Sequence, residues 1–195
     1  MLNALEEIGQ VSGMDMSEDA IGFCREIFSG QIKKGFLPNN IPYPKNNFDL
    51  VVALDVIEHV EDDVAALAAI RDHVVDGGKA IVTVPACKFL WSEHDIVNAH
   101  KRRYNLKELT SKLQASGFVI EKISYFNTLL FPVILVVRAV NNLLKRKSKL
   151  DGETMAVPNI LLNGLLMRIF GLEKYFLRFC DLPPFGVSLI AVVRR

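Results

Sequence analysis

A short polar segment in the middle of the chain concentrates side chains that can do chemistry. It runs from 90 to 104 and contains Trp91, His94, Asp95, His100, Arg102, Arg103 and Tyr104. A histidine titrates near neutral pH and can take a proton from a hydroxyl or an amine. Paired guanidinium groups bind carboxylates and phosphates. The segment therefore predicts a ligand-binding loop with a general base. The alternative is a solvated charge run in which His100 supports the start of the following helix.

Acidic residues follow two of the predicted strands. Ligands of open α/β sheets bind beyond the carboxyl ends of the strands. Asp15 follows a strand expected over 10–14, and a carboxylate there can accept hydrogen bonds from both hydroxyls of a ribose. The alternative is a solvated turn residue or a charge at a helix start. Asp55 follows a strand expected over 48–54, and His59 comes four residues later. A single histidine at such a position is either a base or, more often, a structural group.

The spacing of apolar residues predicts alternating strands and helices, which position these side chains. Strands are expected over 10–14, 31–37, 48–54, 79–84, 118–126 and 186–194; helices are expected over 2–8, 20–28, from 62 or 63 up to 77, and over 106–116. The run from Phe48 to Leu54 is continuously apolar, which indicates a strand buried on both faces. This order of elements predicts a doubly wound α/β sheet.

Composition and charge exclude several classes of function. The chain has 195 residues, which is enough for one domain with a substantial core. Its 23 basic and 22 acidic residues leave a net charge of +1, so we expect no nucleic-acid partner. The three cysteines form no CxxC pair, so we expect no metal site and no disulfides, in a reducing cytoplasm. No signal peptide is recognisable, and the longest apolar run, 129–137, is too short to span a membrane.

Three blocks of sequence resemble those of class I S-adenosylmethionine-dependent methyltransferases of the small-molecule kind called type 11. The blocks are Gly13-Met-Asp15, the nineteen residues PYPKNNFDLVVALDVIEHV from Pro42 to Val60, and Asp76-Gly-Gly-Lys79. The segment 185–194 resembles the family's final strand. The resemblance implies one domain, 1–195, with a Rossmann-like, mostly parallel sheet and an antiparallel last strand. Within it, 1–126 is the expected cofactor-binding core, 127–184 an apolar helical insertion and 185–195 the final strand.

The resemblance also implies a cofactor, S-adenosylmethionine, and roles for individual residues. The expected cofactor-binding residues are Asp15 and Met16 at the ribose, Phe36 and Leu37 at the adenine, and Leu54 and Asp55 at the methionine portion and the acceptor. The expected acceptor-binding residues are His59, Trp91, Arg102, Arg103 and Tyr104. His100, favoured by its basic neighbours, and His94 are the candidate bases for methyl transfer, which requires alignment of the acceptor and removal of its proton.

The chain departs from the family pattern at its start. The family opens with a strand and a glycine-rich turn, an acidic residue followed by GxGxG, around the methionine moiety. Here Met1-Leu-Asn-Ala-Leu resembles the helix that follows that turn, and Gly9 and Gly13 do not replace it. The sequence therefore predicts an N-terminally incomplete domain. In such a domain the strand at 10–14 lacks a hydrogen-bonding partner on one side, and cofactor binding is impaired.

Two apolar helical segments are expected after the core, at about 128–146 and 157–180. The first ends in the basic cluster Lys145-Arg-Lys-Ser-Lys149, and an apolar helix with such an end suits the surface of an anionic membrane. The alternative is that both helices cover the crevice and pack on each other.

Two functions from different classes fit these observations. The first is methyl transfer to an oxygen or nitrogen atom of a small-molecule, lipid-linked or glycan-linked acceptor, because the loop 90–104 resembles that of a bacterial subgroup associated with surface polysaccharide and lipid-carrier chemistry. The second is a non-catalytic methyltransferase-like remnant that acts as a membrane-proximal binding module. A nucleotide-binding oxidoreductase fits less well, because no hydride-transfer motif is present. The expected location is the cytoplasm, with peripheral contact at the inner face of the membrane.

Overall fold

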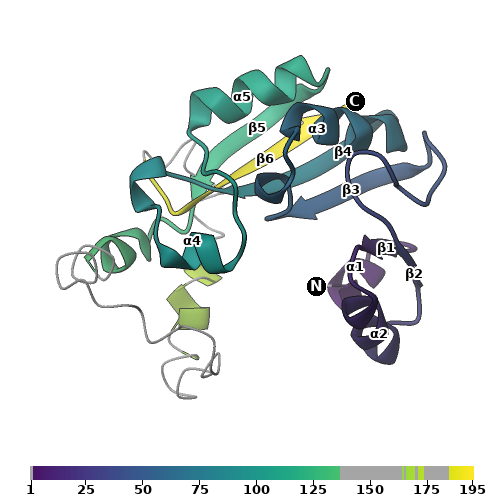
Figure 1. Ribbon diagram of the computed structural model, residues 1–195, viewed down its shortest axis with the longest axis horizontal. Helices are drawn as coiled ribbons and strands as arrows, with labels where there is room; N and C mark the ends of the chain where they lie inside the picture. The colour runs from purple at the N-terminus through teal and green to yellow at the C-terminus, as the bar shows by residue number, and fades with distance from the viewer. Residues whose placement is uncertain (1, 137–163, 165, 170, 174–184) are drawn as a thin grey trace.

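The structure, a computed structural model, describes residues 2–136, 164, 166–169, 171–173 and 185–195 (Figure 1). These residues form two sheets. The smaller sheet pairs β1 (Ser12–Asp15) with β2 (Gln31–Lys34). The larger one contains β3 (Phe48–Leu54), β4 (Val74–Pro85), β5 (Val119–Phe126) and β6 (Ser188–Arg194).

The larger sheet has the strand order β3-β4-β6-β5. β3 and β4 are parallel, whereas β6 is antiparallel to both β4 and β5. β3, β4 and β5 therefore run in one direction and only the last strand is reversed. The predicted antiparallel last strand is confirmed.

Side-chain caps fix where the helices begin. The helices are α1 (Leu2–Glu6), α2 (Glu18–Ile27), α3 (Asp63–His73), α4 (Glu93–Val97) and α5 (Leu106–Ala115). Ser17, Asp62 and Asn105 each accept a hydrogen bond from a backbone N–H in the first turn of α2, α3 and α5, respectively. α3 ends at His73 and not near Gly77 as predicted, because the β-branched pair Val74-Val75 begins β4 and Val74 pairs with Phe48.

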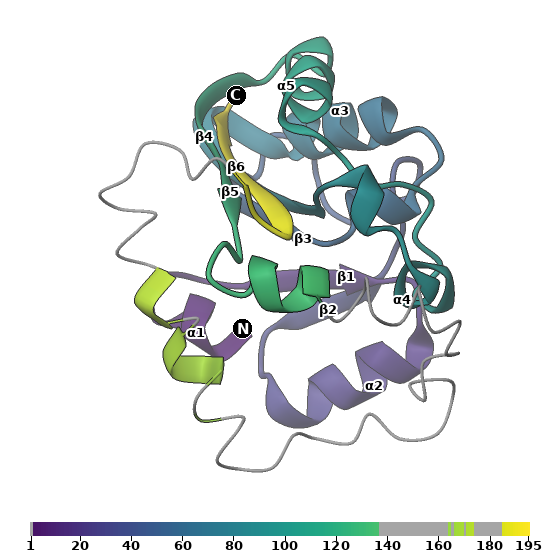
Figure 2. The same ribbon diagram turned by 90° about the vertical axis from the view of Figure 1, so that its left-hand side faces the viewer.

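The main core lies between the larger sheet and the helices α3 and α5, which cover one of its faces (Figures 1 and 2). Its wholly buried residues include Leu67, Val82, Leu109 and Leu189. A second, smaller core of Ile21, Phe28 and Ile32 joins α2 to β2. The pair β1–β2 with α2 lies apart from α3 and α5 in both views.

The two sheets do not share a ladder. Among the described strands β1 pairs with β2 alone. The prediction that β3 is buried on both faces is wrong, since only Ala53 is buried in it. β3 lies at the edge of its sheet. The Tyr43 hydroxyl donates to the carbonyl of Gly13 at 2.6 Å, which ties the small sheet to the segment that enters β3.

The predicted apolar helices after β5 fall largely outside the described residues, as does the basic cluster 145–149. The described parts are helical over 131–136, 166–169 and 171–173. Within the described part of the chain, no helix is long and apolar enough to cross a membrane.

Candidate functional site

The carboxyl end of β1 presents an exposed carboxylate beside exposed apolar side chains. Asp15 ends the strand, and its Oδ1 accepts a hydrogen bond from the backbone N–H of Ser17 at 2.8 Å. Met16 and Phe36 are exposed, and Leu37 is half-buried against the main core. Gly35 donates its N–H to the carbonyl of Asp15, so the ends of β1 and β2 are fixed side by side. A carboxylate acceptor and exposed apolar side chains therefore lie together at this end of the small sheet.

The carboxyl end of β3 carries a strained residue. Asp55 has φ +51°, and its N–H lies 3.1 Å from the carbonyl oxygen and 3.0 Å from Oγ1 of Thr83 in β4. Left-handed backbone at a non-glycine residue costs free energy and is concentrated at functional sites. Leu54 and Val56 on either side are partly exposed.

The loop after β4 folds back onto this end of β3. Within the predicted polar loop, it contains a 3-10 turn, Lys88–Leu90, and the short helix α4. The N–H of Lys101 donates to the carbonyl of Glu58 at 3.0 Å, and Tyr104 forms a parallel bridge with Ala86. Cys87 and Ala99 are also left-handed, at φ +61° and +54°. The loop therefore lies beside the end of β3.

The loop and the turn after β3 enclose a cluster of titratable side chains. His100 Nδ1 lies 3.0 Å from Asp95 Oδ1, and Arg103 Nε donates to the same oxygen at 2.7 Å. Nε2 of His59 and Nε2 of His100 lie 4.0 and 3.9 Å from Oε1 of the buried Glu58. Burial raises the pKa of Glu58 to about 8. Burial alone would raise the pKa of Asp95, but the bond and charge of Arg103, together with the bonds to His100 and to the N–H of Ser92, outweigh burial and lower it.

A second buried carboxylate anchors the end of the loop. Oδ2 of Asp63, in α3, accepts hydrogen bonds from Tyr104 Oη at 2.9 Å and Arg102 Nη1 at 3.0 Å, while Oδ1 accepts from Lys112 Nζ at 2.7 Å. Burial opposes ionisation of Asp63, but these donors outweigh it and lower its pKa. Tyr104 is 0% exposed and Arg103 3%. Both lie beneath the loop, and Arg102 is partly exposed.

The remaining predicted residues lie on the outer side of the loop. His94 is exposed, and its Nε2 lies 3.1 Å from Nδ2 of Asn98. Trp91 is partly exposed. The structure thus brings His100 and His59 together, whereas His94 is not a member of their cluster.

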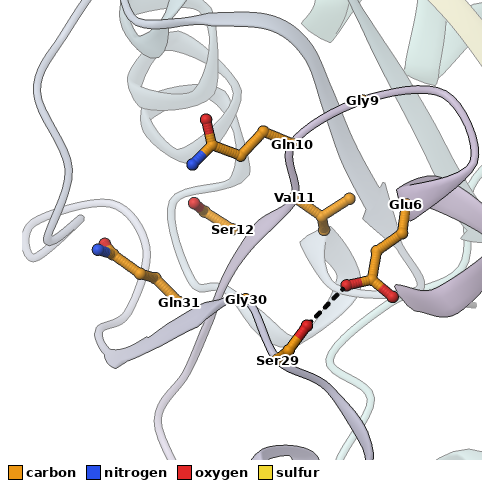
Figure 3. A pocket seen from close by; sticks show the side chains of 8 residues that line it. All are labelled: Glu6, Gly9, Gln10, Val11, Ser12, Ser29, Gly30 and Gln31. Carbon is orange, nitrogen blue, oxygen red and sulfur yellow. Dashed lines mark hydrogen bonds between the residues drawn. The ribbon is translucent and has the colours of Figure 1, made fainter.

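A hollow of about 350 Å³ lies at the other end of the small sheet (Figure 3). Its lining includes Gln10 and Ser12 at the start of β1, Ser29 and Gln31 at β2, and Glu6, which accepts a hydrogen bond from Ser29. These are the amino ends of the strands, away from Asp15 at the carboxyl end.

Sequence reasoning missed the importance of Glu58 and Asp63. The available signal for Glu58 was an acidic residue directly after the apolar pair Val56-Ile57, of which Ile57 is buried. No comparable signal marked Asp63, because its partners come from segments that are 39 to 49 residues away.

Comparisons with known proteins agree with this architecture. A family model described as a methyltransferase domain matches residues 2–123, and the chain belongs to that family. The predicted resemblance to class I methyltransferases is therefore confirmed. Comparison with curated protein sequences gives no match.

Solved methyltransferase structures share the fold. An S-adenosylmethionine-dependent methyltransferase from Mesorhizobium loti has 15% identity and a TM-score of 0.62, over 99% of this chain and 84% of that one. Phosphoethanolamine N-methyltransferase 2 of Haemonchus contortus, in complex with S-adenosylmethionine, has 17% identity and a TM-score of 0.60. The match covers 99% of this chain and 45% of that one. A methyltransferase from Archaeoglobus fulgidus has 16% identity and a TM-score of 0.58, and the match covers 99% of this chain and 79% of that one. The predicted α/β fold is confirmed.

Proposed function

We propose that this chain transfers a methyl group from S-adenosylmethionine to an oxygen or nitrogen atom of a small-molecule, lipid-linked or glycan-linked acceptor. The observation that carries the proposal is the imidazole of His100, fixed by Asp95 beside the end of β3 in a methyltransferase domain. When bound, S-adenosylmethionine supplies an electrophilic methyl group on a sulfonium sulfur. The protein's tasks are to align the acceptor and to remove its proton.

The cofactor-binding residues are those at the carboxyl ends of β1, β2 and β3. The Asp15 carboxylate accepts from the ribose hydroxyls, and Met16 and Phe36 provide apolar contact for the adenine, with Leu37 behind them. Leu54 and Asp55 face the methionine portion. The exposure of Asp15, Met16 and Phe36 supports this assignment.

His100 is the residue best placed to accept the proton. An ionised Asp95 can only accept a hydrogen bond, so Nδ1 of His100 carries the hydrogen and Nε2 carries the lone pair. His94, on the solvent side of the loop, is the second candidate base. His59 and Trp91 contribute to the acceptor side.

The three residues Arg102 to Tyr104 act in this proposal mainly through the two buried carboxylates. Arg103 binds Asp95, and Tyr104 binds Asp63, which positions the loop. Arg102 is partly exposed, so it is also available to a carboxylate or phosphate of the acceptor.

Exposed apolar side chains favour an acceptor with a lipid portion, used at the inner face of a membrane. Phe89, Ile96 and Val97 are exposed on the loop, and Val133 and Val136 are exposed on the helical segment after β5. Phe89 contacts Phe131 edge-on, with ring centroids 6.3 Å apart, so the two segments adjoin. Apolar side chains gathered in this way mark surfaces that bind lipids or partners.

The test uses S-adenosylmethionine labelled on the methyl group. The protein is incubated with a bacterial lipid extract or with a polar metabolite extract, and the label is followed into each phase. Label that enters the lipid extract, and that is lost in a His100→Asn variant, supports the proposal with a lipid-linked acceptor. Label in the polar extract alone supports a small-molecule acceptor. No enzyme-dependent label in either extract, together with no cofactor binding, would overturn the proposal.

The second candidate function is a membrane-proximal binding module without catalysis. The same exposed residues, Val133, Val136 and Phe89, favour it. Binding to lipid vesicles with no thermal stabilisation by S-adenosylmethionine would support this function over methyl transfer.

A further inference from the structure

Glu58 holds a buried carboxyl group that the described residues leave without a hydrogen-bond partner. It is wholly buried, and neither Oε1 nor Oε2 has a hydrogen-bond partner among the described residues. Buried polar groups in native proteins are almost always hydrogen-bonded, and an exception requires an explanation such as a bound ion. Nε2 of His59 and Nε2 of His100 face Oε1 at 4.0 and 3.9 Å, which is too far for a hydrogen bond.

Both imidazoles are held in the form that binds a metal. Nδ1 of His100 lies 3.0 Å from a carboxylate oxygen of Asp95, and Nδ1 of His59 lies 3.3 Å from the carbonyl oxygen of Ala99. Both oxygens are acceptors, so each Nδ1 carries the hydrogen and each Nε2 presents its lone pair toward Glu58. Metal-binding histidines almost always have such a partner on the other ring nitrogen.

We propose that Glu58, His59 and His100 bind a divalent first-row transition-metal ion. One ligand atom from each residue lies within 4.8 Å of the other two. An ion with ligands at about 2.1 Å requires ligand atoms about 3.4 Å apart, so small side-chain rotations close the site. Two imidazoles with one carboxylate suit zinc or iron, whereas magnesium and calcium prefer oxygen ligands alone.

The surroundings of the three ligands suit a cation and leave it accessible. Arg103 compensates the charge of Asp95, and Asp55 adds a further carboxylate near Glu58. The backbone bond from Lys101 to Glu58 holds the loop to the turn, so ligands from two segments remain together. His59 is partly exposed, with 39% of its side chain accessible, and opens one side of the site. Three protein ligands with an open position are the pattern of a catalytic metal site.

The chemical role of the ion, unlike its binding, rests on the proposed methyl transfer. An acceptor hydroxyl bound to a metal loses its proton more readily. The acceptor oxygen then forms the bond to the methyl carbon, the methyl–sulfur bond breaks with its electron pair left on sulfur, and the hydroxyl proton passes to solvent. With the ion bound, His100 is a ligand and no longer a base, so a chelator distinguishes the two roles.

The experiment titrates the chelator-treated full chain with Co²⁺, followed by calorimetry and by visible absorption, and then displaces Co²⁺ with Zn²⁺. We expect one ion per chain. Glu58→Gln, His59→Asn and His100→Asn should each weaken binding on the order of 100-fold or more, because each removes a ligand. His94→Asn is the matched control, from the same loop but outside the cluster, and should bind as the wild type does. Circular dichroism in chelator verifies that each variant is folded. If Glu58→Gln does not fold, His59→Asn tests the metal site instead, because His59 is partly exposed.

Two outcomes overturn the metal site: no saturable Co²⁺ binding by the wild type, or equal binding by folded wild type and folded His59→Asn. Failure of the proposed function is a separate result. Co²⁺ binding without any methyl transfer leaves the site in place and removes the function. Methyl transfer that a chelator does not change, with no Co²⁺ binding, retains the function with His100 as base and removes the site.

Discussion

His100 Nδ1 and Asp95 Oδ1 are 3.0 Å apart, and the backbone N–H of His100 also donates to the carbonyl of Asp95 at 2.8 Å. Asp95 thus holds both the side chain and the backbone of His100. Asp95 is wholly buried, and Arg103 binds the same carboxylate oxygen. The orientation of the candidate base or ligand therefore depends on a buried ion pair within its own loop.

Replacing Asp95 with Asn should destabilise the protein by about 3–5 kcal/mol, because it leaves Arg103 buried without a charged partner. Urea unfolding at neutral pH measures the loss. Asp19→Asn, an exposed acid on α2, is the control and should cost a few tenths of a kcal/mol at most. A second substitution, Arg103→Met, should recover part of the loss, since it removes the unpaired cation. A double variant that is less stable than Asp95→Asn would contradict this account.

The role of Asp63 predicts a pH dependence. Its pKa is lower in the folded chain than the usual value near 3.9, so it contributes stability that is complete above that value and is lost as the pH falls through the folded pKa. Asp63→Asn should therefore cost about 3 kcal/mol at neutral pH, through its weakened bonds to Lys112, Tyr104 and Arg102. The difference in free energy of unfolding between Asp63→Asn and the wild type should shrink below about pH 4. Urea unfolding across this range checks the prediction, and a difference that stays constant would show that ionisation of Asp63 does not matter.

Much of the fold was predictable because helix caps and apolar runs are encoded by neighbouring residues in the sequence. Ser17 and Asp62 marked the starts of two helices, and the apolar runs marked the strands. Two expectations failed for reasons that depend on neighbours in space. The helix expected to reach Gly77 ended earlier because Val74 pairs with Phe48. β3 lies at the edge of its sheet, and Ala53 alone of its residues is buried.

The location of the candidate site could be predicted from the sequence, but the contacts within it could not. Asp15 and Asp55 were identified because they follow predicted strands, and the loop 90–104 was identified by its residue types. Sequence spacing did not indicate that Glu58 meets His100, which is 42 residues away, because a turn and a loop bring them together. The expectation of no metal site rested on the spacing of the cysteines, and that spacing carries no information on ligands that the fold brings together from distant segments.

Asp15→Asn should weaken binding of S-adenosylmethionine by at least 10-fold, because an amide replaces the carboxylate that accepts from the ribose hydroxyls. The shift in melting temperature at a fixed, high cofactor concentration should fall accordingly. Asp19→Asn again serves as the control and should keep the wild-type shift. An unchanged shift for Asp15→Asn would remove Asp15 from the cofactor site.

The exposed apolar surface predicts binding to membranes. A substantial fraction of the protein should co-sediment with anionic vesicles at low salt, and less at high salt as charges are screened. Val133→Ser with Val136→Ser should reduce the bound fraction, and the melting temperature should stay unchanged because both side chains are exposed. Absence of wild-type binding at low salt would exclude the membrane contact.

Tyr43 connects the small sheet to the rest of the chain, so its hydroxyl should control the local stability of that sheet. Tyr43 Oη donates to the carbonyl of Gly13, and its ring packs edge-on against Phe48 with centroids 5.4 Å apart. Tyr43→Phe keeps the ring contact and removes the hydrogen bond, which should cost about 1 kcal/mol. Because β1 and β2 share no ladder with the larger sheet, amide hydrogen exchange should accelerate in 12–15 and 31–34 and remain unchanged in β4 and β6. Tyr125→Phe, in β5, is the matched control and should leave exchange in β1 and β2 at the wild-type rate. Equal acceleration in both sheets of Tyr43→Phe would mean that they unfold as one unit.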